Sequence, residues 1–133
     1  MDEVVRGAMA KWPDVPAVFG WLALDLRGQW LIRNEPVTNL LLTDFIGRNY
    51  ACDDHGRWFF QNGPQRVFVA LAYTPWILRV ETADTLLTHT GAHVRSVRGA
   101  WMDREGIIVL HTEHGAAAIG HRDVQGPGGA FSV

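Results

Sequence analysis

The histidines of this chain gather toward its C-terminal end. His89 and His93 are four residues apart, a spacing that places two imidazoles on one face of a helix and that zinc sites often use. His111 and His114 follow at a predicted strand end and turn, where they could converge with the first pair. A divalent-metal site, in a metal-binding protein or a metal-dependent hydrolase, is therefore one hypothesis.

Other features of the same segment disfavour that site. Gly91 lies between His89 and His93, and threonines flank His89, so the segment is a poor helix former. No glutamate follows His89, so the signature of a helical metalloprotease is missing. The competing interpretation is a set of surface histidines without a ligand. The sequence leaves both interpretations open.

Six tryptophans make a second group of candidates. Four of them lie on predicted strands next to turns, where they could line one end of a sheet: Trp21, Trp30, Trp58 and Trp101. Exposed aromatic clusters are typical of ligand clefts and protein interfaces. The alternative is that these rings fill a core and form cross-strand pairs.

Arg66 ends an unusually polar segment, residues 62–66, between two apolar strands. If its guanidinium faces a cleft, it suits an anionic ligand. If it faces solvent, it is part of an ordinary hairpin tip.

The chain shows no catalytic template. Its serines, Ser96 and Ser132, do not lie in a nucleophile elbow, and Cys52 is its only cysteine. The glycines at 126, 128 and 129 have no strand before them and no helix after, so they do not predict a phosphate-binding loop. The sequence therefore predicts no catalytic residue and favours a protein that is not an enzyme.

Composition sets the broad class. The chain has 133 residues, of which 47% are hydrophobic and 20% charged, as expected of one globular domain. A net charge of -2 disfavours nucleic acid as a partner. With one cysteine there is no intramolecular disulfide. The N-terminus is acidic rather than signal-like, and no apolar run reaches the ~20 residues of a membrane span. We expect a soluble cytoplasmic protein.

Hydrophobic periodicity predicts helices at about Glu3–Trp12, with Asp2 as its cap, and Asn39–Tyr50, with Thr38 or Asn39 as its cap. Alternation predicts the strands Phe19–Asp25, Gln29–Asn34, Arg57–Gln61, Arg66–Tyr73, Trp76–Glu81, Val94–Met102, Ile107–Thr112 and Ala116–Ile119. The strand Arg66–Tyr73 is apolar on both faces, which is typical of a central strand. The segment Thr82–Ala92 is ambiguous between a single helical turn and a plain connection.

One turn sequence recurs along the chain. Aspartate is followed three residues later by glycine in 25–28, 53–56 and 103–106, and 112–115 is a looser version that begins with threonine. Aspartate can accept backbone N–H groups at the first turn position, and glycine takes the left-handed conformation at the fourth. We interpret these segments as the hairpin turns of an antiparallel meander.

These elements predict an α+β fold, a mainly antiparallel sheet meander with one or two helices packed on it. We expect a single domain over 1–133, with a subdivision near 82–92 as the alternative and a flexible tail at 124–133.

Residues 56–67 together with 73–76, the stretch Gly20-Trp21-Leu22 and the stretch Asn34-Glu35-Pro36 resemble an uncharacterised family of small proteobacterial proteins. The resemblance covers most of the chain and implies a bacterial, cytoplasmic protein. It assigns no activity and no site residue.

The leading functional hypothesis is a non-enzymatic binding or interaction module. We expect it to associate with itself, as a homodimer, through an aromatic surface or an edge strand. A small ligand near Arg66 or another protein partner remains open.

Overall fold

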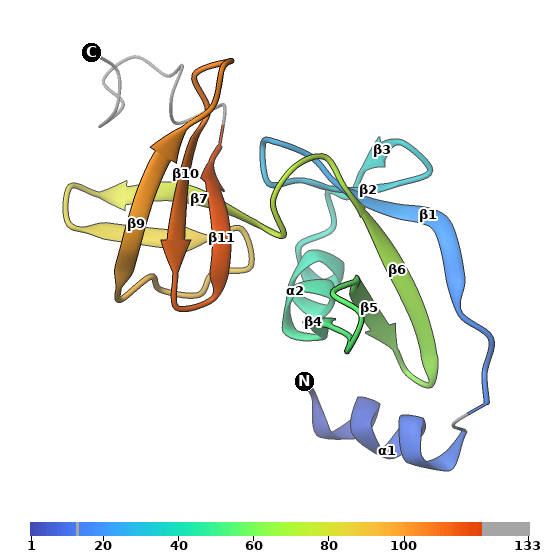
Figure 1. Ribbon diagram of the computed structural model, residues 1–133. Helices are drawn as coiled ribbons and strands as arrows, with labels where there is room; N and C mark the ends of the chain where they lie inside the picture. The colour runs from blue at the N-terminus through green and yellow to red at the C-terminus, as the bar shows by residue number, and fades with distance from the viewer. Residues whose placement is uncertain (13, 121–133) are drawn as a thin grey trace. The chain divides into compact units, whose positions relative to one another are not determined.

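The computed structural model describes residues 1–12 and 14–120, and the tail predicted at 124–133 lies outside that range. In chain order its elements are α1 (Glu3–Lys11), β1 (Val18–Leu24), β2 (Trp30–Ile32), β3 (Glu35–Pro36), α2 (Leu40–Arg48), β4 (Tyr50–Cys52), β5 (Trp58–Asn62), β6 (Gln65–Leu71), β7 (Trp76–Thr82), β8 (Thr85–Thr88), β9 (Val97–Met102), β10 (Ile108–Thr112) and β11 (Gly115–Ile119). They form two compact units (Figure 1). Of the described residues, the first unit comprises those within 1–24 and 30–71, and the second comprises 25–29 and 72–120.

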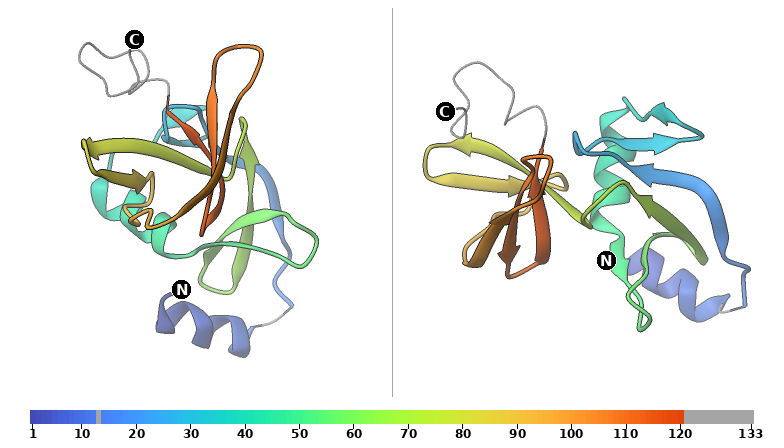
Figure 2. Two further views of the ribbon diagram at one scale, coloured as in Figure 1. Left: turned by 60° about the vertical axis from the view of Figure 1, so that its left-hand side comes forward. Right: turned by 45° about the horizontal axis from the view of Figure 1, so that its top comes forward.

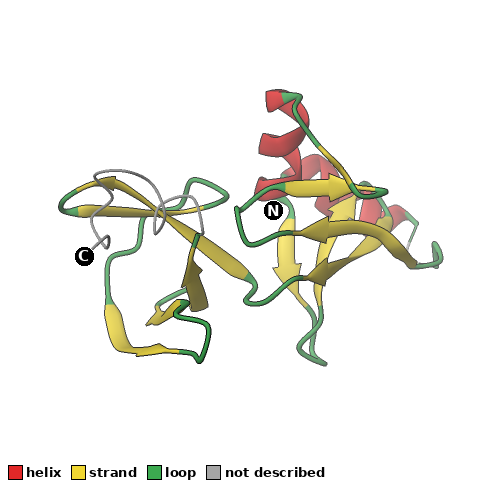
Figure 3. Ribbon diagram, turned by 90° about the horizontal axis from the view of Figure 1, so that it is seen from above, coloured by secondary structure: helices red, strands yellow, loops and turns green. Residues whose placement is uncertain are grey.

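The first unit is built on a six-stranded sheet in the order β3-β2-β1-β6-β5-β4. The strand β6 lies in the interior of this sheet, as its two apolar faces predict. It pairs antiparallel with β5 across the tight turn at Gly63 and Pro64, and parallel with β1. Both helices belong to this unit, and Figure 3 shows no helix in the described part of the second.

Aromatic side chains fill the core of the first unit. Trp30 keeps 3% of its surface exposed and packs edge-on against Tyr50, with 5.0 Å between the ring centroids. Tyr50 in turn contacts Trp58 at 4.9 Å. Burial raises the pKa of the Tyr50 phenol well above its usual range, because the phenolate would lose its hydration. This cluster joins β2, β4 and β5.

The helix α2 begins as predicted, since the side chain of Asn39 accepts a hydrogen bond from the backbone N–H of Leu42. Asp2 is the N-cap residue of α1, as predicted, but its side chain makes no capping hydrogen bond. Its carboxylate instead binds Arg48 and Asn49 at the end of α2, which ties the start of α1 to α2.

The second unit is a five-stranded sheet in the order β8-β7-β11-β10-β9. Its ladders are antiparallel except the one between β7 and β11. Figure 1 shows β7 and β8 crossing the direction of the other three strands, so this sheet is strongly coiled. The curled face encloses a core of Leu78, Leu110, Ala117 and Ile119.

The recurring aspartate turns share one geometry. In 25–29, 53–57 and 103–107 the aspartate Oδ1 accepts the backbone N–H groups two and four residues later. The glycine of each turn has a positive φ, between 77° and 84°, and donates its N–H to the aspartate carbonyl. These bonds hold the pKa of the Asp53 and Asp103 carboxyls below their usual value, because they favour the charged form.

Gly28 has a second role beside its positive φ. A Cβ at this position would lie 3.1 Å from the Cβ of His89 and 3.5 Å from Ile77, so the turn packs directly on these two residues within the second unit. Gly106 has the same backbone conformation, with nothing within 4 Å of an added Cβ. Comparing alanine substitutions at Gly28 and Gly106 therefore separates the cost of backbone strain from the cost of close packing.

We expect Gly106→Ala to lower the free energy of unfolding by about 1 kcal/mol through strain alone. Gly28→Ala should cost roughly 1–3 kcal/mol more, because the turn must move away from His89. Urea denaturation of both variants measures the difference. Equal losses would contradict the close packing of this turn.

The α+β class and the dominance of antiparallel pairing are confirmed, but the single meander is wrong at Thr74-Pro75. There the chain leaves the first sheet, and β7 pairs with β8 and β11 instead of β6. The ambiguous segment Thr82–Ala92 contains the strand β8. In the described residues no helix is long and apolar enough to cross a membrane.

Candidate functional site

The four histidines proposed as metal ligands do not share a site. His111 Nε2 accepts a hydrogen bond from the Trp101 indole, and His114 Nε2 is 2.8 Å from the carbonyl of His93. His89 Nδ1 accepts the backbone N–H of Ile77. Within 1–12 and 14–120, no three histidine, cysteine, aspartate or glutamate side chains gather as a metal site would need.

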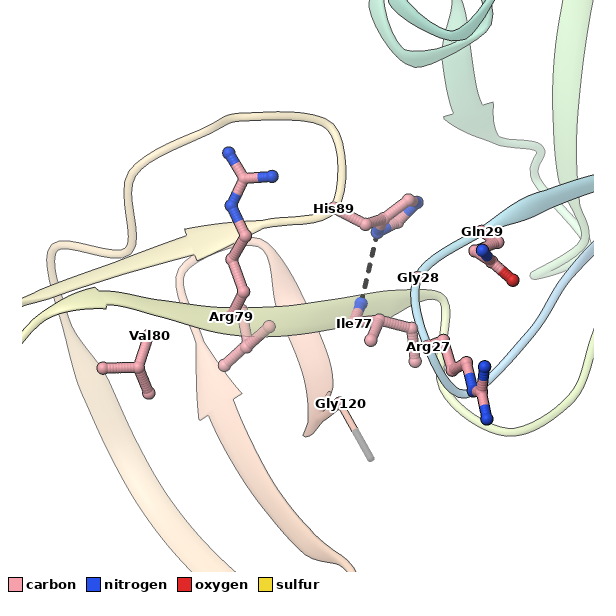
Figure 4. A pocket seen from close by; sticks show the side chains of 9 residues that line it. Arg27, Gly28, Gln29, Ile77, Arg79, Val80, His89 and Gly120 are labelled. Atoms are coloured by element: carbon pink, nitrogen blue, oxygen red, sulfur yellow. Dashed lines mark hydrogen bonds between the residues drawn. The ribbon is translucent and has the colours of Figure 1, made fainter. Parts of the chain in front are cut away.

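His89 borders a pocket of about 240 Å³ in the second unit (Figure 4). Its Nε2 is shielded from solvent although the residue keeps some exposed surface. Burial lowers the pKa of His89 to about 3, because the imidazolium would be poorly hydrated. Arg27 and Arg79 also line the pocket, but Figure 4 shows their guanidinium groups pointing in different directions. The pocket therefore does not clamp an anion between two arginines.

The predicted aromatic candidates are divided between the two units. Trp21, Trp30 and Trp58 lie in the first, where Trp30 is buried and the other two are half-buried. Trp101 lies on β9 of the second unit and keeps 47% of its surface exposed. Trp12, which the sequence did not single out as a site residue, is exposed at the end of α1.

The strand β9 presents an exposed apolar edge. Val97, Trp101 and Met102 are exposed by 47%, 47% and 63%, and Arg98 is the only charged residue of the strand. A register shift at Arg98 interrupts the pairing with β10, because Gly99 pairs with His111 and Val97 with Thr112. The Trp101 indole donates a hydrogen bond to His111 Nε2 on β10. The ring is thereby held in place at the surface.

The other strand edges in the described range are short or covered. The edge strand β3 has two residues, one of them Pro36, and β4 has three. The outer side of β8 bonds to the segment that follows it, through Thr88 to Ala92 and Val94 to Leu86. Proteins protect sheet edges by such devices and by charged side chains and bulges. The edge strand β9 is six residues long, and within residues 1–12 and 14–120 its protection is limited to Arg98 and the register shift beside it.

Arg66 borders a pocket in the first unit. The pocket has a volume of about 360 Å³ and is lined by Met9, Trp12, Val15, Ala17, Gln61, Pro64 and Arg66. Figures 1 and 2 show α1 next to the turn end of the β5–β6 hairpin, and this hairpin supplies the last three of these residues. Arg66 thus borders a cleft. The sequence predicted that an Arg66 guanidinium facing a cleft would suit an anionic ligand.

Sequence reasoning missed the α1 side of this pocket. Met9 and Trp12 fit an apolar helical stripe, and nothing in that stripe indicates that its end lies beside a turn about fifty residues later. Sequence reasoning also failed to predict the exposed edge of β9. The run Val97–Met102 contains a single charge, which is a sequence signal for an apolar strand, but only the strand order shows that this strand lies at the edge of its sheet.

The sequence profile of a family described as "Protein of unknown function (DUF2946)" matches residues 1–131. The chain belongs to this family. The match confirms the resemblance to an uncharacterised family, and the family's description assigns no activity. A comparison with curated proteins finds no match.

Two solved structures share the fold of this family member. A DUF1285 family protein from Silicibacter pomeroyi DSS-3 has a TM-score of 0.58 and 13% identity, over 92% of this chain and 80% of that one. A DUF1285 family protein from Shewanella baltica OS155 has a TM-score of 0.54 and 15% identity, over 75% of this chain and 84% of that one. At these identities the similarity concerns the fold alone.

Proposed function

We propose that this protein is a non-enzymatic interaction module that forms a homodimer by pairing β9 of two copies. The observation that carries the proposal is the exposed, six-residue edge of β9, which bears one charge. An antiparallel partner strand would satisfy the outward-pointing backbone groups and cover the exposed apolar side chains.

The order of residues in β9 suits a second copy. A twofold axis perpendicular to the sheet pairs residues of the same face, so Gly99 or Ala100 lies at the centre. With Gly99 at the centre, Arg98 of one copy lies opposite Ala100 of the other. With Ala100 at the centre, Arg98 lies opposite Met102. Neither register places the two Arg98 side chains opposite each other, so the strand is compatible with itself in charge as well as in shape.

Ala100→Lys tests the dimer directly. Ala100 is exposed, so a lysine fits the monomer, yet in the dimer it would face Arg98 or the lysine of the other copy. We expect the dimer dissociation constant to rise at least about tenfold. Sedimentation velocity over a range of concentrations, on protein without an affinity tag, measures this constant.

Leu41→Lys is the matched control. Leu41 on α2 in the first unit is exposed by 82%, so the same charge is introduced on another exposed apolar residue. This variant should dimerise like the wild type. The proposal fails if the wild type is monomeric throughout, or if Leu41→Lys dissociates while Ala100→Lys does not.

A further inference from the structure

We infer that the pocket beside Arg66 binds a small monocarboxylate with an apolar body. The inference is independent of the dimer, because every residue that lines this pocket belongs to the first unit and none to β9. Three observations support it. The Nη groups of Arg66 are available for hydrogen bonds, other contacts hold its guanidinium in place, and the surrounding pocket walls are apolar.

The charge of Arg66 is not neutralised within the protein as described. No carboxylate of residues 1–12 or 14–120 forms an ion pair with it, whereas Arg48, Arg57 and Arg79 each have an acidic partner. Among these described residues, its hydrogen bond is the one that Nε donates to Gln61 Oε1 at 3.5 Å. The two Nη nitrogens therefore keep their N–H groups for a ligand.

Two contacts hold the guanidinium in position. It lies over the Phe59 ring, with 3.9 Å between its central carbon and the ring centroid. Gln61, its cross-strand partner, is 2% exposed and is itself fixed by a bond from Nε2 to the carbonyl of Gly63. A half-buried, stacked guanidinium loses little freedom on binding, and its planar fork matches the two oxygens of one carboxylate.

The rest of the lining is mostly apolar. Met9, Trp12, Val15, Ala17 and Pro64 provide hydrophobic and aromatic surface, and the volume lies in the range of small-molecule sites. Trp12 is exposed by 50%, so a ligand body would cover surface that is now in contact with water. A single cation beside such walls selects an acid with an aromatic ring or a short alkyl chain, and not a polyanion.

Phenylacetate and hexanoate are suitable probes, with phenylacetamide and hexanamide as neutral counterparts. We expect both acids to bind saturably, with chemical-shift changes confined to the residues of the pocket, and the amides to bind at least about tenfold more weakly. Two-dimensional NMR titration of the full chain measures binding and location together.

Arg66→Gln should weaken the binding of both acids at least about tenfold. Arg79→Gln removes a similar charge from the second unit, so it is the matched control and should bind like the wild type. Ala17→Trp keeps Arg66 but narrows the pocket, and it should also abolish binding. Thermal melts show whether each variant is folded.

Three results would each overturn the inference: no saturable binding of either acid by the folded wild type, equal affinity for acid and amide, or unchanged binding by a folded Ala17→Trp variant. Chemical-shift changes centred outside the pocket would do the same. Because β9 takes no part in the pocket, a negative result here leaves the proposed dimer standing, and the reverse is equally true.

Discussion

Replacing Trp30 with alanine is expected to lower the free energy of unfolding by about 3–5 kcal/mol. Trp30 is 3% exposed and its ring packs on Tyr50, which packs on Trp58. Removing the indole would leave a cavity where β2, β4 and β5 meet, and the neighbouring rings are too large to close it without leaving their own contacts. Urea denaturation measured by circular dichroism gives the loss.

Trp12→Ala is the matched control for that experiment. It removes the same side chain from the same unit, but Trp12 is exposed by 50%. We expect it to lower the free energy of unfolding by less than about 1 kcal/mol. Comparable losses of unfolding free energy in the two variants would contradict the burial of Trp30. Trp30 would then again be a candidate for an exposed binding residue.

His89 is expected to make the second unit sensitive to mild acid. Its pKa is about 3 in the folded protein, below the ordinary value of 6.5, because its ring is buried. Between these values the unfolded chain binds the extra proton, so the free energy of unfolding rises with pH. The stability contributed by neutral His89 is complete above pH 6.5 and is lost as the pH falls from 6.5 toward 3. The loss is about 2 kcal/mol between neutral pH and pH 5.

His89→Asn isolates this effect. The asparagine oxygen can accept the Ile77 N–H in place of Nδ1, and asparagine does not titrate in this range. The variant should therefore lose most of the pH dependence between pH 7 and pH 5, although it can be less stable at neutral pH. Urea denaturation at several pH values measures the slope.

His55→Asn is the control, since His55 is exposed on a turn of the first unit and its replacement should leave the slope unchanged. The carboxyls whose pKa is lowered, Asp2, Asp53, Asp103 and Glu113, act in a separate window. Their contribution is lost only as the pH falls below their ordinary values near 4. An unchanged slope in His89→Asn would contradict a buried, neutral His89.

The aromatic and histidine candidates show that residue type and sequence spacing alone do not predict which side chains are exposed or lie together. Trp30 and Trp101 have the same sequence context, a strand residue near a turn, yet one is buried and the other is exposed. The difference lies in strand order, because β2 is covered by the aromatic core while β9 is an edge. Likewise the spacing of His89 and His93 suggested a shared ligand, but the strand β8 and the turn after it direct the two residues to different partners.

The sequence by itself determined the features that depend on hydrogen bonds between residues close together in the chain, or on the pattern of a single strand. The aspartate turns at 25–28, 53–56 and 103–106, a cap for the second helix at Thr38 or Asn39 and the period-two strands belong to this group, because each depends on local hydrogen bonds or on the alternation of a single strand. Strand pairing was decided only in the tertiary structure. The parallel ladders β1–β6 and β7–β11 and the pocket that Trp12 shares with Arg66 bring together residues more than thirty positions apart. The exposed edge of β9 follows from the same strand order. Many pairings of similar apolar strands satisfy the same alternation, and only the packing of the whole unit selects among them.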